Sequence, residues 1–171
     1  MYILFTTLLI GCANIVSLTG GQVDSAPPTL IRSTPPNKST NFKASDVLLE
    51  FDEYIQFKNQ SSIRISPVCE PPPKISIRGK KIELEFLCSL EKDITYTINF
   101  GNSICDLNEF NALENFTYVF TTGQLLDTIT IGGKAKDAYS LEDINGAMIG
   151  LYKTHEFSSP HYYTYTKNNN N

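Results

Sequence analysis

The sequence predicts an all-β protein, a sandwich of two antiparallel sheets, and three observations support this fold class. Apolar and polar residues alternate with a period of two in short segments between residues 29 and 123. Turn-forming stretches such as "STPPN" and "EPPPK" separate these segments and keep proline outside them. Helical periodicity is almost absent, and a single helical turn fits only in "DLNEFNALEN" at 106–115. About seven short strands between turns are typical of a one-domain β-sandwich.

Three strands are expected in the first part of this region. "TLIRSTPP" is a candidate for the first edge strand. "VLLEF" places Val47, Leu49 and Phe51 on one face of the next strand, because side chains alternate between faces. Glu50 and Asp52 follow the opposite, polar face, which indicates a solvated surface rather than a catalytic pair of carboxylates. "SSIRISP" is a shorter candidate further along.

The remaining strands are expected between residues 74 and 122. "KISIRGKKIELEF" indicates two strands around Gly79, and "ITYTINF" and "FTYVFTT" each alternate in the same way. From these patterns we expect Phe51, Phe86, Ile98 and Phe120 to pack between the two sheets, with Glu83 on the outer face. The alternating apolar residues of the strands between 74 and 122 are Ile75, Ile77, Ile82, Leu84, Phe86, Ile94, Tyr96, Ile98, Phe100, Phe116, Tyr118 and Phe120.

The N-terminus has the pattern of a secretion signal. The apolar run 2–10 is too short to span a bilayer, which needs roughly 20 apolar residues. Its length is typical of a signal-peptide core, although no Lys or Arg precedes it. "LIGC" at 9–12 resembles the bacterial lipobox, and this resemblance implies cleavage before Cys12 and a lipid on its sulfur. An ordinary buried cysteine is the alternative. We expect a signal peptide at 1–11 and a lipidated cysteine with a flexible tether at 12–28.

Charge and motif content argue against several function classes. The 14 basic and 18 acidic residues give a net charge of −4 without a basic cluster, so nucleic-acid binding is not expected. "HEFSSPH" has the wrong spacing for a zinc protease helix, and we predict no cofactor and no metal site. Besides Cys12, the cysteines are Cys69, Cys88 and Cys105. Their spacing matches no zinc motif, and free buried thiols are expected, with one disulfide among them as the alternative.

Several motifs resemble a known family. "STPPN", "LLEFDEYI" and "TYTINFGNSICDLNEFNALENFTYVFTTG" are similar to bacterial Ig-like domains of the SbsA type, which occur in surface lipoproteins of Bacteroidota. "CANIVSLTGG" resembles the opening that follows the lipidated cysteine in those proteins. The resemblance implies an immunoglobulin-like β-sandwich at 29–123. It also implies a tyrosine corner at Tyr96, whose hydroxyl would return to the upstream backbone. The alternative is a core tyrosine with a solvent-facing hydroxyl.

Residues 124–171 resemble the start of a second β-sandwich. "DTITIGGKAKDAYSLEDINGAMIGLYK" is similar to the opening of a carboxypeptidase-regulatory-like or transthyretin-like domain, with strands expected at 128–135 and 147–152. Such a domain needs several further strands, so we expect an incomplete second β-domain with a disordered asparagine tail.

Two tripeptides are candidate modification sites. Asp24-Ser25-Ala26 and Asp127-Thr128-Ile129 are similar to the O-glycosylation signal of Bacteroidota, which makes Ser25 and Thr128 the candidate acceptors. Both lie in predicted linkers, where an acceptor would be exposed.

These observations together predict a non-catalytic lipoprotein of the bacterial cell envelope. The lipid on Cys12 would attach it to the outer membrane, with the folded part in the periplasm or on the surface. Its expected role is a spacer or a module that binds an envelope protein or a glycan. The alternatives are an accessory domain of a longer envelope enzyme and a carbohydrate-binding module. In the last case the stacking side chains would be Tyr152, Tyr162, Tyr163 and Tyr165.

Overall fold

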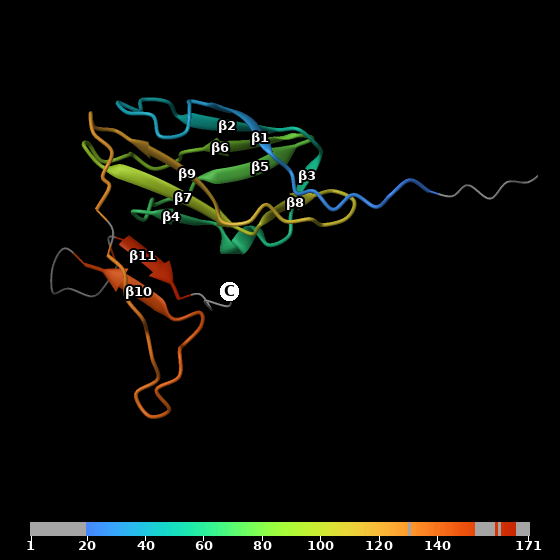
Figure 1. Ribbon diagram of the computed structural model, residues 1–171. Coiled ribbons are helices and arrows are strands. Elements are labelled where there is room, and N and C mark those ends of the chain that lie inside the picture. Colours follow the sequence, from blue (N-terminus) through green and yellow to red (C-terminus); the bar gives the residue numbers. More distant parts are fainter. Residues whose placement is uncertain (1–19, 130, 153–159, 161, 167–171) are drawn as a thin grey trace, which may run out of the picture.

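The computed structural model describes residues 20–129, 131–152, 160 and 162–166. Two antiparallel sheets face each other and enclose a single core, which confirms the predicted all-β sandwich (Figure 1). The signal segment and Cys12 lie outside the described residues. No helix within the described ranges is long and apolar enough to cross a membrane.

The first sheet has four strands in the order β1-β2-β6-β5. They are β1 (Leu30–Thr34), β2 (Asp46–Phe51), β5 (Lys74–Arg78) and β6 (Lys81–Glu85). Strands β5 and β6 form the predicted hairpin, which turns at Gly79 with a φ of +63°. Glycine adopts this left-handed conformation at little cost because it has no Cβ.

The second sheet has three strands in the order β4-β7-β9. They are β4 (Arg64–Ser66), β7 (Thr95–Gly101) and β9 (Phe116–Thr121). The segment 38–42 runs beside β9, and the backbone N–H of Thr121 donates to the carbonyl of Ser39 over 2.9 Å. Backbone hydrogen bonds therefore cover this edge of β9.

Two short strands and one loop differ from the prediction. Strands β3 (Ile55–Phe57) and β8 (Ile104–Asp106) pair with each other, and their three-residue segments are too short to show alternation. A 3₁₀ turn at Gln60–Ser62 precedes β4. The helical turn considered at 106–115 does not form, because the backbone of this segment is instead bound by the Asp106 carboxylate.

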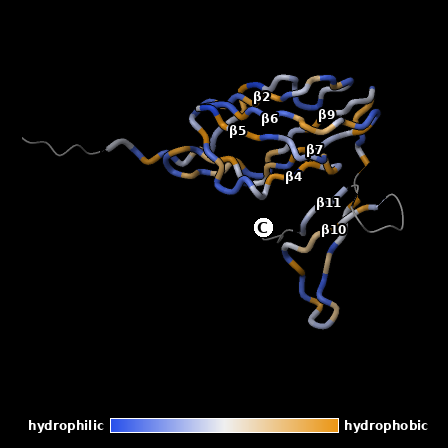
Figure 2. Tube along the Cα trace, turned by 180° about the vertical axis from the view of Figure 1, so that it is seen from behind, coloured by the Kyte–Doolittle hydropathy of each residue, from blue (hydrophilic) through white to orange (hydrophobic). Residues whose placement is uncertain are grey.

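The core confirms the predicted strand faces. The ring of Phe120 lies at its centre, with ring centroids of Phe42 at 4.0 Å and of Tyr96 and Phe86 at 5.4 Å. Figure 2 shows hydrophobic and hydrophilic residues alternating along the sandwich strands. The predicted residues that are buried are Val47, Leu49, Phe51, Ile82, Leu84, Phe86, Tyr96, Ile98, Phe100, Tyr118 and Phe120. Ile75, Ile77, Ile94 and Phe116 are partly buried against this core.

The expectation of free thiols is wrong for two of the three cysteines. Cys69 and Cys88 form a disulfide with a Cα–Cα distance of 5.7 Å, whereas Cys105 is free and buried. The reason is the β5–β6 hairpin. It brings the segment that precedes β5 next to the segment that follows β6, although the two cysteines are 19 positions apart in the sequence.

The C-terminal segment forms a separate hairpin rather than the predicted pair of strands. Strand β10 (Met148–Leu151) matches the second expected strand and pairs with β11 (Tyr162–Tyr165). No strand forms among the described residues of 128–135, where two consecutive glycines interrupt the alternation. The hairpin lies beside the β4-β7-β9 sheet, away from the first sheet (Figure 1). The resemblance to a carboxypeptidase-regulatory-like domain stays a prediction.

Candidate functional site

The predicted modification sites lie apart from one another. Ser25 precedes β1 and Thr128 follows β9, and both residues are exposed. Exposure is what a glycan acceptor requires, and the two assignments stay predictions. The lipidation site at Cys12 lies outside the described residues.

Tyr96 contacts the upstream backbone through its hydroxyl. The oxygen accepts a 2.9 Å hydrogen bond from the backbone N–H of Glu91, five positions earlier. The ring is buried and stacks on Phe120, and this burial raises the pKa of Tyr96 above its ordinary value. The contact is of the kind that the predicted tyrosine corner requires.

The carboxylates on the outer face of the first sheet are engaged in structural contacts. Glu50 pairs with Arg32 at 2.7 Å and with Lys81 at 3.3 Å, and hydrogen bonds from these two cations lower the pKa of Glu50. Asp52 accepts hydrogen bonds from the hydroxyl and the backbone N–H of Thr29, which lower its pKa. Within the described ranges, no cluster of three or more His, Cys, Asp or Glu side chains could hold a metal ion.

Asp106 organises the loop after β8. Its carboxylate accepts backbone hydrogen bonds from Glu109 at 2.8 Å and Phe110 at 2.6 Å, and a side-chain hydrogen bond from Asn111 at 2.8 Å. Burial alone would raise the pKa of Asp106. The hydrogen bonds outweigh this effect and hold the pKa below its ordinary value. These contacts explain the loop without a ligand.

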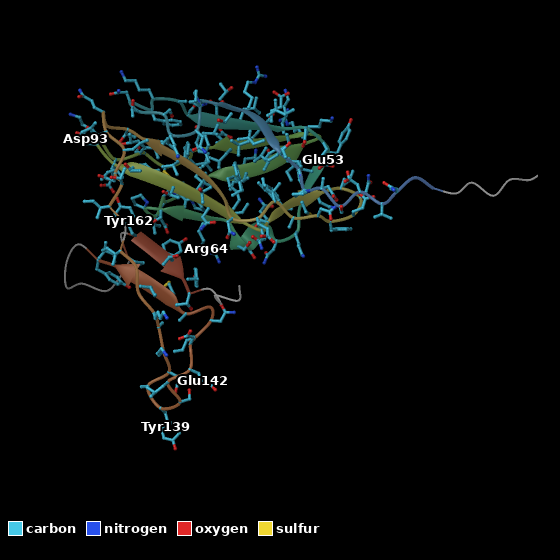
Figure 3. The ribbon with its side chains drawn as sticks, in the orientation of Figure 1. Glu53, Arg64, Asp93, Tyr139, Glu142 and Tyr162 are labelled. Atoms are coloured by element: carbon cyan, nitrogen blue, oxygen red, sulfur yellow. A yellow bond between two sulfur atoms is a disulfide. The ribbon has the colours of Figure 1, made fainter. Side chains whose placement is uncertain are left out.

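A polar groove of about 560 Å³ lies between the second sheet and the C-terminal hairpin. Its first wall comes from β4 and β7, whose alternate residues face away from the core. Figure 3 shows Arg64 on the side of the sandwich that faces the hairpin. The second wall comes from β11. The groove is lined by Ser62, Arg64, Ser66, Thr97, Asn99, Gly101, Asn102, Asn115, Tyr163, Thr164 and Tyr165.

Aromatic rings of β11 and a cation of β4 join the two walls. Tyr163 and Tyr165 are two positions apart, so they share one face of the strand, with ring centroids 6.1 Å apart and ring planes at 85°. The Arg64 guanidinium carbon lies 5.2 Å from the centroid of the Tyr165 ring, which is a cation–π distance. Partial burial raises the pKa of Tyr163, and the nearby Arg64 charge acts in the opposite direction.

Several polar groups in the groove have no partner within the described part of the chain. Nη1 of Arg64 donates to the carbonyls of Ser61 and Ile63, whereas its Nε and Nη2 make no hydrogen bond there. The hydroxyls of Ser66 and Thr97 are likewise unused. The groove therefore offers unused hydrogen-bonding groups beside two tyrosine rings.

The sequence identified only part of this groove. Of the four tyrosines proposed to stack on sugars, Tyr163 and Tyr165 line it, whereas Tyr152 and Tyr162 do not. Sequence reasoning missed Arg64 and Thr97 as site residues. The only available signal was their outward-facing position in predicted strands, which most surface residues share.

A comparison with known protein families matches the part of the chain that forms the sandwich. The sequence profile of the family described as "Bacterial Ig-like domain" matches residues 24–122, which include every strand from β1 to β9. A crystal structure of PcoC, a methionine-rich copper resistance protein from Escherichia coli, is similar at 16% identity with a TM-score of 0.40. The match covers 56% of this chain and 98% of that protein. No curated protein matches the sequence significantly.

Proposed function

Because the chain belongs to the bacterial Ig-like domain family, we propose that it is a non-catalytic binding module of the bacterial cell envelope. An Ig-like fold does not by itself choose a ligand, so the binding role needs a site. The observation that supports it is the groove between the β4-β7-β9 sheet and the hairpin. Its unused donors and acceptors are positioned by a rigid sandwich on one side.

Two features support a location outside the cytoplasm and attachment to a membrane. The Cys69–Cys88 disulfide is typical of an oxidising compartment such as the periplasm or the cell surface. The lipobox-like "LIGC" supports a lipid on Cys12, which would attach the chain to the outer membrane. In this proposal the segment 13–28 is the tether that separates the sandwich from the lipid.

The polar chemistry of the sandwich supports a role without catalysis. The pKa values of Glu50, Asp52 and Asp106 are all lowered by hydrogen bonds or ion pairs, so these carboxyls stay ionised at neutral pH. A general acid needs the opposite shift. Glu53 shows that shift, because partial burial and the nearby negative charges of Asp106 and Asp52 raise its pKa. Glu50, Asp52 and Asp106 each stabilise a structural contact instead.

The C-terminal segment favours a second candidate, an accessory domain of a longer envelope enzyme. Ile129, Ile131 and Leu151 are exposed, and a neighbouring domain would remove this apolar surface from water. The downstream genomic sequence tests this candidate. An in-frame catalytic domain would support it, and an unrelated downstream gene would exclude it.

The anchor is tested by mass and fractionation. In the native cell, the mature protein is expected to lack residues 1–11, to carry the mass of acyl chains and to sediment with membranes. Cys12→Ser removes the acceptor thiol, so an unprocessed precursor without lipid is expected. Identical mass shifts and identical fractionation of both proteins would contradict the anchor.

The binding role is tested by measuring how the purified protein binds to cell envelopes. The full chain with Cys12→Ser is added to native envelopes stripped of protein, and saturable binding is expected. Arg64→Gln should weaken this binding about tenfold, the effect of losing one charge-assisted contact. Arg78→Gln is the matched control, because Arg78 is an exposed arginine on the other sheet. Equal binding by both variants would exclude the groove.

A further inference from the structure

We propose that the groove binds an acidic saccharide, a sugar chain with carboxylate groups, and that Arg64 binds the carboxylate. This inference rests on the proposed binding role and adds the chemical class of the ligand. Three properties of the lining residues support this ligand class: their hydrogen-bonding capacity, their aromatic surface and their charge.

The hydrogen-bonding side chains suit sugar hydroxyls. The unused groups on the sheet wall are the hydroxyls of Ser66 and Thr97 and the amide Nδ2 of Asn99, whose Oδ1 accepts from Gly101 at 2.8 Å. Hydroxyls can donate and accept, so they pair with either role of a sugar hydroxyl. The described residues that line the groove include no Val, Leu, Ile, Met or Ala. A bound peptide would leave its apolar side chains without a pocket, which favours a saccharide over a peptide.

The tyrosines supply an apolar surface that is compatible with a sugar ring. Tyr163 is held in the ladder opposite Gly150, and Tyr165 opposite Met148. A sugar ring presents C–H groups on its faces, and a tyrosine ring combines an apolar body with a polar tip. The hairpin thus contributes stacking surface, and the sheet contributes the hydrogen bonds.

The charge of the groove favours an anionic sugar over a neutral one. The whole chain carries a net charge of −4, yet among the described residues that line the groove there is no Asp or Glu, and Arg64 is the one charged side chain. The unused Nε and Nη2 of Arg64 lie on one edge of the guanidinium, the edge that binds a carboxylate through two parallel hydrogen bonds. A nucleic acid would require several cations, and the described lining offers one.

The test uses charged sugars and their neutral counterparts. The probes are trimers of galacturonic, glucuronic and mannuronic acid, each paired with its methyl ester, which removes the charge and keeps the ring. They are titrated into the full chain with Cys12→Ser by calorimetry. At least one acid is expected to bind saturably and about tenfold more tightly than its ester, the gain from one charge-assisted pair. This preference should weaken as salt is added.

Variants separate the roles of the two walls. Arg64→Gln should abolish the preference for the acid over the ester, and Tyr163→Ala should weaken both forms by a similar factor. Tyr139→Ala is the matched control, because Tyr139 is 99% exposed at the far tip of the C-terminal segment (Figure 3). This control should bind like the parent. Thermal unfolding of each variant verifies that the sandwich is intact, and amide exchange in β10 and β11 verifies that the hairpin still forms the second wall.

Two results would overturn the proposal, and they can be distinguished from each other. If no acid binds more tightly than its ester while envelope binding still depends on Arg64, the ligand class is wrong and the binding role stands. If envelope binding is also unaffected by Arg64→Gln, both proposals are wrong. A preference for the acid that persists in Arg64→Gln would exclude Arg64 as the carboxylate ligand.

Discussion

Apolar side chains are buried in the sandwich, whereas several are exposed in the C-terminal segment 124–166 that contains the hairpin. In the sandwich, Leu49 and Phe120 are 0% exposed, because two sheets enclose them. In the C-terminal segment, Ile129 is 88% and Ile131 82% exposed. The hydrophobic effect therefore stabilises the sandwich from within and contributes little to the segment. The segment must be held by its contacts with the sandwich.

Two contacts between described residues link the segment to the sandwich. The backbone N–H of Asp127 donates to the hydroxyl of Thr95 at 2.9 Å, and the Arg64 guanidinium lies over the Tyr165 ring. An isolated two-stranded hairpin is at best marginally stable in water. One wall of the groove is thus rigid, and the other depends on the docking of β11. Four predictions test this contrast, from the largest effect to the smallest.

Loss of a core ring should damage the protein far more than loss of an exposed side chain. Phe120→Ala removes the ring at the centre of the aromatic cluster and should lower the free energy of unfolding by about 3–5 kcal/mol. Ile131→Ala in the C-terminal segment, and Glu83→Ala on the outer face, should each stay within about 0.5 kcal/mol. Urea denaturation measures all three. Similar effects of Phe120→Ala and Glu83→Ala would mean that the strand register is wrong.

Reduction of the disulfide should lower the stability of the sandwich and should not act on the hairpin directly. The Cys69–Cys88 disulfide closes a loop of 19 positions, and its loss should cost about 2–4 kcal/mol. Residues 124–171 contain no cysteine, so the hairpin has no bond to lose. The melting temperature of the wild type should fall when a reductant is added. The double variant Cys69→Ser/Cys88→Ser should melt lower and show no response to reductant; a response would point to Cys105.

Each of the two regions contains a loop that is capped by an Asp carboxylate, buried in one and exposed in the other. Asp106 is buried, whereas Asp137 is exposed and accepts backbone hydrogen bonds from Tyr139 at 2.9 Å and Ser140 at 2.8 Å. At pH 7, Asp106→Asn should lower the melting temperature of the sandwich, because an amide oxygen replaces only one of the two accepting oxygens. Asp137→Asn should leave that temperature unchanged.

The effect of Asp106→Asn should depend on pH with a definite sign. The folded-state pKa of Asp106 is lower than its unfolded value of about 3.9, so the ionised form favours folding above that pH. This contribution is lost as the pH falls through the lower, folded-state value. The difference in melting temperature between wild type and variant should therefore be full at pH 7 and shrink below about pH 4. A constant difference would mean that Asp106 acts through packing alone.

Loss of the docking contact should loosen the hairpin and spare the sandwich. Arg64→Ala removes a cation–π contact of about 0.5–1 kcal/mol, so amide exchange in β10 and β11 should accelerate while that in β7 stays slow. Lys80→Ala removes a similar contact with Tyr54, at 5.6 Å within the sandwich, and should not change exchange in the hairpin. Accelerated exchange in β7 with Arg64→Ala would mean that the two regions unfold as one unit.

Prediction from sequence succeeded where a strand is long enough to alternate. The strands β2, β5, β6, β7 and β9 were expected with the correct inner faces. It failed at β3 and β8, which have three residues each, and at β11, whose sequence YYTY shows no alternation of apolar and polar residues. Of the residues that line the candidate groove, only Tyr163 and Tyr165 were identified from the sequence. A tyrosine can be proposed to stack on a sugar from its residue type alone, whereas a polar residue becomes a site residue only through its neighbours.

The sequence by itself determined the fold class, the β5–β6 hairpin and the faces turned toward the core. These follow from local chemistry, because side-chain direction within a strand and the conformation of Gly79 depend on neighbouring residues alone. Only the tertiary structure decided that Cys69 meets Cys88 and that Arg64 of β4 lies over Tyr165 of β11. Such pairings depend on the packing of segments that are distant in sequence, which no local pattern encodes.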